Sequence, residues 1–227
     1  VYLSAVVNAE AIAAWMDEKK ARGAPVPLTA ILLKGLGLSV REHPEARTLY
    51  YSPPPRLVRF DDCHVTIPVE REVEGERMVI FANVKDCDSR SIRDLTYELR
   101  KLRDAPIDEI PEFAWWVKMA KFPRLVRKAI YLPMQYFPAI RATGWGTFGL
   151  TNIGSAGVDD FLPLAAATVT FGVGALKERP VAENGLVVAR KTLALTLMFD
   201  HRAIDGYPAA RFFQDCAKRL EKPDFLE

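Results

Sequence analysis

Apolar and polar positions follow two periods along the chain, and together they predict a mixed α/β protein. Apolar residues at helical spacing predict four helices, over residues 9–21, 30–42, about 91–103 and 207–220. Runs rich in β-branched residues predict strands over residues 1–8, 64–69, 78–84, 147–153, 165–174 and 186–199, the last as one long strand or two. Asn8 is expected to cap the first helix, and Ser89 or Ser91 the third. We expect one sheet flanked by helices.

Residues 105–143 differ in character from the rest of the chain. They combine seven aromatic residues with a cluster of basic residues over 118–128 and five prolines, at positions 106, 111, 123, 133 and 138. The segment is too hydrophobic to be disordered, and it reads as short helices broken by prolines. Because prolines interrupt each amphipathic run, the pattern argues against a membrane surface here.

Composition excludes several classes of function. The chain has 227 residues, of which 49% are hydrophobic and 26% charged, which fits a soluble globular protein of one large domain or two small ones. A net charge of only +2 argues against a nucleic-acid binder. Three cysteines without C-x-x-C spacing argue against a disulfide framework and against a metal site, and favour a reducing cytoplasmic setting. Nowhere do 18 apolar residues run together, so no transmembrane helix is predicted.

The strongest chemical signal is the run FDHRAIDG at residues 199–206. His201 follows an apolar strand and precedes a tight turn at Gly206, so its ring is presented at a surface or cleft. Imidazole is the side chain best matched to general-base catalysis near neutral pH. Asp205 can hold the turn or a neighbouring cation. The residues by themselves leave open a His201 that only makes structural hydrogen bonds.

Several segments in the same order carry a family resemblance. The run at 199–206 resembles the His-x-x-x-Asp-Gly signature of the acyltransferase component of 2-oxo acid dehydrogenase complexes, the dihydrolipoamide acyltransferases. GTFGLTNIG at 146–154, GVGALKERPV at 172–181, VKDCDSRS at 84–91 and PAARF at 208–212 are similar to further segments of that family. The likeness covers nearly the whole chain except about 105–143. It implies the fold that chloramphenicol acetyltransferase shares, a mixed β-sheet flanked by helices.

The resemblance also implies a reaction and the residues that perform it. His201 is the expected general base, which takes a proton from a thiol as the sulfur attacks an acyl thioester. Thr151 is the expected hydroxyl donor to the oxyanion, and no acyl-enzyme forms. Asp205 is expected to support the site through an arginine that should lie upstream of residue 1. Gly206 forms the structural turn, and Gly149, where the family usually has threonine, is expected to widen the channel.

Substrates and partners follow from the same resemblance. The acyl group is exchanged between a dihydrolipoyl thiol and coenzyme A, with coenzyme A as a substrate and the lipoyl group not attached to this chain. We expect one catalytic domain over residues 1–227, with an insertion at about 105–143 and no lipoyl or subunit-binding domain in the chain. The expected assembly is a homotrimer with active sites between subunits, open to growth into a cage. Components of a 2-oxo acid dehydrogenase complex or a lipoyl carrier are the expected partners.

Two other functions stay open. The chain could be a stand-alone coenzyme A-dependent acyltransferase with another acceptor. It could also be a non-catalytic trimer or cage core that uses residues 105–143 as a partner surface. That segment could equally cap the acyl-donor channel or fold onto its own trimer as extra core. The acyl group and the acceptor are not set by the sequence.

Overall fold

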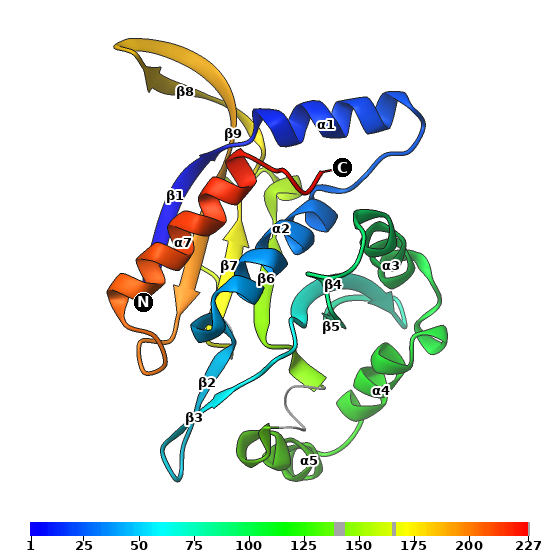
Figure 1. The fold of residues 1–227 in the computed structure, drawn as a ribbon. Coiled ribbons are helices and arrows are strands. Elements are labelled where there is room, and N and C mark those ends of the chain that lie inside the picture. Colours follow the sequence, from blue (N-terminus) through cyan, green and yellow to red (C-terminus); the bar gives the residue numbers. More distant parts are fainter. Residues whose placement is uncertain (139–143, 165–166, 227) are drawn as a thin grey trace.

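A seven-stranded mixed sheet forms the centre of the computed structural model, which describes residues 1–138, 144–164 and 167–226 (Figure 1). The strands lie in the order β1-β9-β7-β6-β4-β5, and β8 pairs with the first half of β9. β6 runs parallel to β4 and β7, and the other pairs are antiparallel. The strands are β1 (Tyr2–Asn8), β4 (Val65–Val73), β5 (Glu76–Val84), β6 (Phe148–Asn152), β7 (Val169–Val173), β8 (Lys177–Glu183) and β9 (Leu186–Phe199).

Helices cover one face of this sheet and extend past its end. α2 lies between α7 and α3, and α7 packs on β1 (Figure 1). The helices are α1 (Glu10–Ala21), α2 (Leu28–Glu42), α3 (Ile92–Asp104), α4 (Pro111–Ala120), α5 (Arg124–Tyr136) and α7 (Gly206–Glu221), with short 3-10 turns η1 (Pro44–Arg47), η2 (Ile107–Glu109) and η3 (Gly154–Ala156). A separate hairpin joins β2 (Thr48–Tyr51) to β3 (Arg56–Arg59).

The core lies between the sheet and α2 and α7. Phe148 on β6 contacts Phe171 on β7 with ring centroids 6.2 Å apart, and Phe171 contacts Phe212 on α7 at 5.8 Å. All three rings are fully buried. Each such side chain contributes about 1.5–3 kcal/mol by leaving water, so this chain of rings fixes β6 and β7 against α7.

The opposite face of the sheet is only partly covered. Side chains alternate between the two faces of a strand, so Val79 and Phe81 point away from the helices while their neighbour Ile80 is buried beneath them. Val6 on β1 is likewise exposed beside buried Val7. Large apolar side chains are therefore exposed on this face at both edges of the sheet.

Most predicted elements are confirmed, with shifts at their ends. Residues 186–199 form one strand. Ser91 caps α3 by accepting the N–H of Asp94, and α1 begins at Glu10, one residue later than a cap at Asn8 requires. The side chain of Asn8 instead accepts the N–H of Glu10 at 3.0 Å. Residues 165–166 of the strand expected over 165–174 lie outside the described residues, and β7 begins at Val169.

The segment at 105–143 forms short helices separated at prolines, as the sequence predicts, with one correction. Pro111 starts α4 and Pro123 precedes α5, which are positions where the missing N–H has no helical partner in any case. Pro133 lies inside α5 without ending it, so the expected break there is wrong. Residues 139–143 lie outside the described residues.

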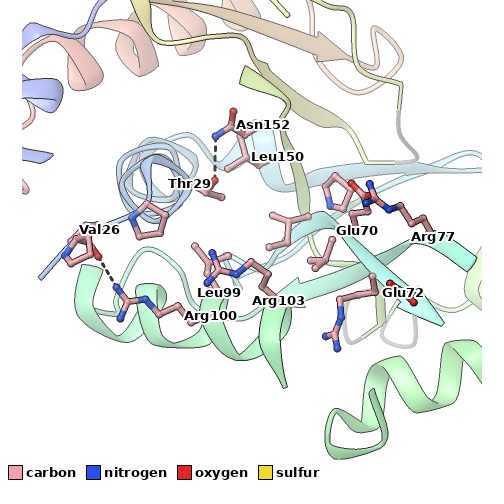
Figure 2. A pocket seen from close by; sticks show the side chains of 16 residues that line it. Val26, Thr29, Glu70, Glu72, Arg77, Leu99, Arg100, Arg103, Leu150 and Asn152 are labelled. Carbon is pink, nitrogen blue, oxygen red and sulfur yellow. Dashed lines mark hydrogen bonds and ion pairs between the residues drawn. The ribbon is translucent and has the colours of Figure 1, made fainter. Parts of the chain in front are cut away.

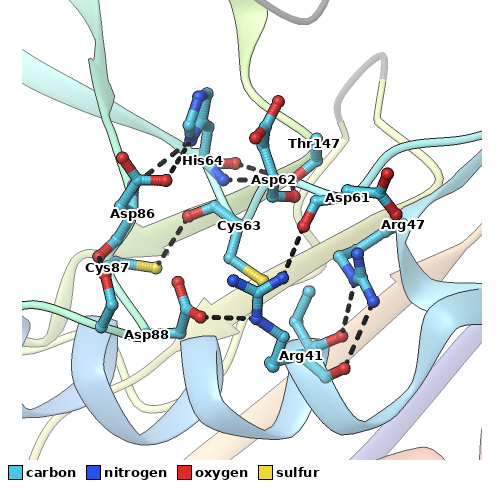
Figure 3. A network of polar contacts seen from close by, with 12 residues as sticks. Arg41, Arg47, Asp61, Asp62, Cys63, His64, Asp86, Cys87, Asp88 and Thr147 are labelled. Atoms are coloured by element: carbon cyan, nitrogen blue, oxygen red, sulfur yellow. Dashed lines mark hydrogen bonds and ion pairs between the residues drawn. The ribbon is translucent and has the colours of Figure 1, made fainter.

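A polar network ties α2 to the loop that follows β5 (Figure 3). Asp88 is buried, and its Oδ2 accepts a hydrogen bond from Arg41 Nε at 2.7 Å. Lys34 donates to the backbone oxygen of Asp88, and buried Arg47 donates to the backbone oxygens of Val40 and Phe60. Charged hydrogen bonds of this kind hold the loop in one arrangement.

No helix in the described parts of the chain is long and apolar enough to cross a bilayer.

Burial predicts that the cysteines are chemically silent in the native protein. Cys63, Cys87 and Cys216 are all buried and unpaired, and burial raises the pKa of Cys63 to about 11. At pH 8 only about one Cys63 thiol in a thousand is then ionised, and thiolate is the reactive form. A thiol-specific reagent should therefore label the native protein far more slowly than the protein in denaturant, where three thiols react. Fast labelling of a native thiol would contradict this burial.

Candidate active site

His201 is presented on the turn that joins β9 to α7. β9 is buried from Leu195 to its last residue, Phe199, and the chain then reaches the surface. The His201 side chain is 52% exposed, and its ring centroid lies 5.7 Å from that of Phe199. The buried side chain of Ile204 anchors the turn two residues before α7. The local sequence, a buried strand followed by a short polar turn, therefore produces an accessible imidazole.

An ion pair stiffens this turn next to His201. Arg202 donates to both carboxylate oxygens of Asp200, at 2.9 and 2.7 Å. These hydrogen bonds hold the pKa of Asp200 below its usual range. The guanidinium of Arg202 also lies over the ring of Tyr50, 4.6 Å from its centroid. The hairpin β2–β3 thus contacts the turn that carries the histidine.

Asp205 lies near Nδ1 of the His201 ring, and Gly206 lies near Nε2. The Oδ1 atom of Asp205 lies 3.8 Å from Nδ1 of His201, and the Asp205 side chain is otherwise well exposed. A Cβ atom placed on Gly206 would have Nε2 of His201 as its nearest neighbour, at 3.8 Å. Nδ1 therefore faces the carboxylate, and Nε2 lies on the side of Gly206. Among the described residues, no arginine forms an ion pair with Asp205.

Thr151 lies on β6 and points to the partly covered face of the sheet. Its strand neighbours Phe148 and Leu150 are buried beneath the helices, so the alternation of side chains turns Thr151 the other way. Asn152 fixes the end of the strand, because its side chain donates to Thr29 Oγ1 at 3.2 Å and accepts the N–H of Gly154 at 3.1 Å.

His201 and Thr151 do not meet within one chain. Thr151 pairs with Gly172 on β7, and Gly172 pairs with Thr196 on β9. At about 4.8 Å per strand and 3.3 Å per residue, the Cα atom of Phe199 is about 14 Å from that of Thr151, and His201 is two residues further on. A hydrogen-bonded pair needs about 3 Å. The structure therefore joins His201 with Asp205 and leaves Thr151 apart.

Gly149 does not widen the channel, which corrects the sequence expectation. A Cβ atom at position 149 would lie 2.8 Å from Oγ1 of Thr170, its partner on β7. The Thr170 side chain is buried and already occupies the space that a larger residue at 149 would need. Sequence reasoning missed that the Thr170 side chain fills the space beside Gly149, because positions 149 and 170 are neighbours only through strand pairing.

A cleft of about 940 Å³ opens on the helix side of β6, between α2, α3 and β4 (Figure 2). Leu150 and Asn152, which flank Thr151 in the sequence, line its inner end. Pro27 and Thr29 at the start of α2 form one wall. The charged residues that line it are Glu70, Arg71, Glu72, Arg77, Arg100 and Arg103.

The arginines give this cleft an excess of positive charge. Arg71 donates to the backbone oxygens of Leu102 and Ala105, and Arg100 donates to that of Pro25 at 2.7 Å. Backbone oxygens orient a guanidinium without neutralising it, so both charges remain available to an anion. Sequence reasoning missed these residues because arginines at helical spacing in α3 look like an ordinary solvated helix face.

His43 and His64 make their hydrogen bonds away from His201 and Asp205. His43 is half-buried between Glu45 and Asp215, 3.1 Å from each. His64 lies with Asp62 and Asp86 in a group whose potential metal-ligand atoms are within 4.8 Å of one another. Its Nδ1 atom accepts the backbone N–H of Asp86 at 3.2 Å, so that lone pair is already used (Figure 3).

Comparison with known proteins finds similarity to one family of acyltransferases. Residues 125–227 match the model of the 2-oxoacid dehydrogenases acyltransferase catalytic domain. Over these residues, which are less than half of its length, the chain is similar to that acyltransferase family. It is similar to the dihydrolipoyllysine-residue acetyltransferase component of the acetoin cleaving system of Bacillus subtilis (strain 168), with 42% identity over 82 residues, which are 35% of this chain and 21% of that protein. The corresponding component of the pyruvate dehydrogenase complex of Staphylococcus aureus (strain Mu50 / ATCC 700699) is 35% identical over 82 residues, 35% of this chain and 19% of that protein. The chain thus spans about a fifth of the length of these curated relatives.

Solved structures confirm the fold. The dihydrolipoamide acetyltransferase of Azotobacter vinelandii superposes with a TM-score of 0.73 at 21% identity, over 100% of this chain and 83% of that one. The probable dihydrolipoamide acetyltransferase of Listeria monocytogenes 4b F2365 gives 0.71 at 18% identity, over 98% and 84%. Chloramphenicol acetyltransferase gives 0.55 at 16% identity, over 100% and 88%. The predicted fold class is therefore right.

The contact between positions 149 and 170 is testable. Gly149→Ala should lower the free energy of unfolding by about 1–3 kcal/mol, because the new methyl group overpacks against Thr170. The double variant Gly149→Ala/Thr170→Ala should recover most of this loss, as measured by chemical denaturation. Strictly additive effects in this double-mutant cycle would contradict the contact.

Proposed function

We propose that this chain is an acyltransferase catalytic domain that exchanges an acyl group between a dihydrolipoyl thiol and coenzyme A. In this proposal residues 1–227 form one domain, and about 105–143 is an insertion into it. The family match over 125–227 and the accessible His201 on its turn support this reading. The three unpaired, buried cysteines favour a reducing, cytoplasmic setting.

The observation that carries the proposal is the separation of His201 and Thr151 within one chain. Two groups that act on the same reacting atoms must lie within a few ångströms of them. Register places the two residues far apart, while Thr151 lies on a sheet face that leaves Val79 and Phe81 exposed. A homotrimer in which His201 of one subunit meets Thr151 of the next satisfies both facts. One similar solved structure is the cubic core of a pyruvate dehydrogenase complex, which supports assembly of this fold into larger particles.

The chemistry then follows from the two nitrogens of His201. Nε2 takes the proton of the attacking thiol, and the thiolate sulfur forms a bond to the carbonyl carbon of the acyl thioester. The carbonyl oxygen becomes an oxyanion, to which the Thr151 hydroxyl donates a hydrogen bond. When the intermediate collapses, the carbon–sulfur bond of the original thioester breaks and the leaving thiolate takes the proton back from Nε2. Asp205, on the Nδ1 side, favours the transient imidazolium.

We further propose that the arginine-lined cleft beside β6 holds coenzyme A. Its phosphates carry several negative charges, and within the described parts of the chain the guanidiniums of Arg71 and Arg100 donate to backbone oxygens and form no ion pair. The cleft reaches Leu150 and Asn152, the neighbours of Thr151 on β6, so a chain bound in it must pass around the end of β6 to reach the Thr151 side chain on the other face of the sheet. A dihydrolipoyl group, which has no phosphates, would approach from elsewhere. A 2-oxo acid dehydrogenase complex or another lipoyl carrier would supply it.

Complementation between two inactive variants tests the shared site. His201→Ala and Thr151→Val should each lower kcat by about a hundredfold or more, because each removes one catalytic group. Co-expressed in equal amounts, they should form mixed trimers in which about one quarter of the sites join an intact His201 to an intact Thr151. Activity should therefore return well above that of either variant alone.

The control is Thr151→Ser, which keeps the hydroxyl and should stay active. Each single variant must also show the wild-type oligomeric state by light scattering. Mixed particles as inactive as the single variants would place both groups of a site in one chain, or remove one of them from the reaction.

The cleft makes a separate prediction about coenzyme A. Arg100→Gln should raise the KM for coenzyme A by about tenfold or more, since a charge-assisted hydrogen bond is lost, and should leave the KM for dihydrolipoamide unchanged. Lys101→Gln is the matched control, because Lys101 is exposed on the same helix and does not line the cleft. Equal changes for both substrates would argue that Arg100 acts on folding alone.

A further inference from the structure

One end of the molecule is formed by two segments that are distant in the sequence. The β2–β3 hairpin and α5 lie together there, at the end opposite β8 (Figure 1). Arg56 at the start of β3 donates a hydrogen bond to the backbone oxygen of Tyr136 in the last turn of α5, at 2.9 Å. We call residues 48–60 and 113–138 the basic end.

The basic end has a charge that the whole-chain sum conceals. It contains seven basic residues and no aspartate or glutamate: Arg56, Arg59, Lys118, Lys121, Arg124, Arg127 and Lys128. The rest of the chain holds 24 basic and 29 acidic residues, because the totals are 31 and 29. Only Lys121, which pairs with Glu74 at 2.7 Å, has a carboxylate partner among the described residues. The charges of the molecule are therefore segregated, with the basic end strongly positive.

Exposed apolar side chains form a stripe within this positive surface. On α5, Leu125, Leu132 and Tyr136 are seven and then four residues apart, which places them on one side of the helix. Leu125 is 81% exposed, Phe137 directly after the helix is 59% exposed, and Leu57 on the hairpin is 56% exposed. A monomeric surface rarely leaves so many large apolar residues open.

Basic residues border the stripe on one side. Arg124 and Lys128 are exposed, one turn apart, and helical geometry places them next to the line of Leu125 and Leu132. Because Pro133 does not end α5, the amphipathic face runs the full length of the helix. The sequence argument against a membrane surface assumed interrupted helices, and for α5 that assumption does not hold.

We propose that the basic end binds the surface of an anionic lipid bilayer, with α5 lying in the plane of the interface. A helix with basic residues beside an exposed apolar stripe, and modest overall hydrophobicity, is the type that lies at the boundary of headgroups and acyl chains. Exposed Tyr136, Phe137 and Trp115 supply aromatic rings suited to that layer. The negative charge on the rest of the molecule orients the basic end toward an anionic surface.

Vesicle co-sedimentation tests the proposal with the complete protein. We expect binding to phosphatidylcholine vesicles that contain about 30% phosphatidylglycerol, and at least tenfold weaker binding to pure phosphatidylcholine or in 0.5 M salt. Arg124→Gln/Lys128→Gln should weaken binding to the anionic vesicles by about tenfold, and Leu125→Glu/Leu132→Glu should abolish it. Neither pair belongs to the proposed catalytic machinery, so acyl-transfer activity in solution should stay unchanged.

Matched control variants distinguish binding by the basic end from non-specific adsorption to vesicles. Leu186→Glu/Val187→Glu changes two exposed apolar residues at the start of β9, and Lys19→Gln/Lys20→Gln removes two positive charges from α1. Both should bind vesicles as the wild type does. Absence of wild-type binding to anionic vesicles, equal binding to neutral ones, or equal loss in the control variants would each overturn the proposal. Such a result would leave an acidic protein as the occupant to consider.

Discussion

The structure depends on the unequal covering of the two faces of its central sheet. Helices α2, α3 and α7 bury one face, where the rings of Phe148, Phe171 and Phe212 form the core. Because strand side chains alternate, every residue that faces this core has neighbours that face the other way. Thr151 is one of these neighbours. The packing that stabilises the subunit thus also points the proposed oxyanion donor toward the partly covered face of the sheet, where the proposed trimer places a second subunit.

What could be predicted from the sequence was local along the chain. The strand, turn and helix around His201 follow from apolar periodicity and a glycine at the right place, so the exposed imidazole and its contact with Asp205 were accessible to pattern reasoning. The distance between His201 and Thr151 was not, because it arises from strand register across β6, β7 and β9. The side chain of Thr170 fills the space beside Gly149 for the same reason. Strand pairing determines the His201–Thr151 distance and the contact between positions 149 and 170, and the spacing of residues along the sequence does not reveal that pairing.

Pro133 shows that a residue expected to end a helix can lie within one. Proline removes a hydrogen-bond donor, and in mid-helix it also crowds the preceding turn. At position 133 the affected carbonyl belongs to Ala129, which is exposed and can be solvated, and only three residues of α5 follow. The penalty is small at such a site, so the amphipathic pattern prevails over the residue that is expected to break it.

Symmetry links the proposed trimer to the basic end. Rotation about a single threefold axis leaves the height of every atom along that axis unchanged, so the three copies of α5 lie at one level. If that level is near a pole of the trimer, three amphipathic helices meet a flat surface together, and weak single contacts combine into a strong one. A cage of many trimers would turn these surfaces in several directions. Membrane association therefore fits an isolated trimer better than a closed particle. The proposed active site needs only the trimer, so it is compatible with either assembly.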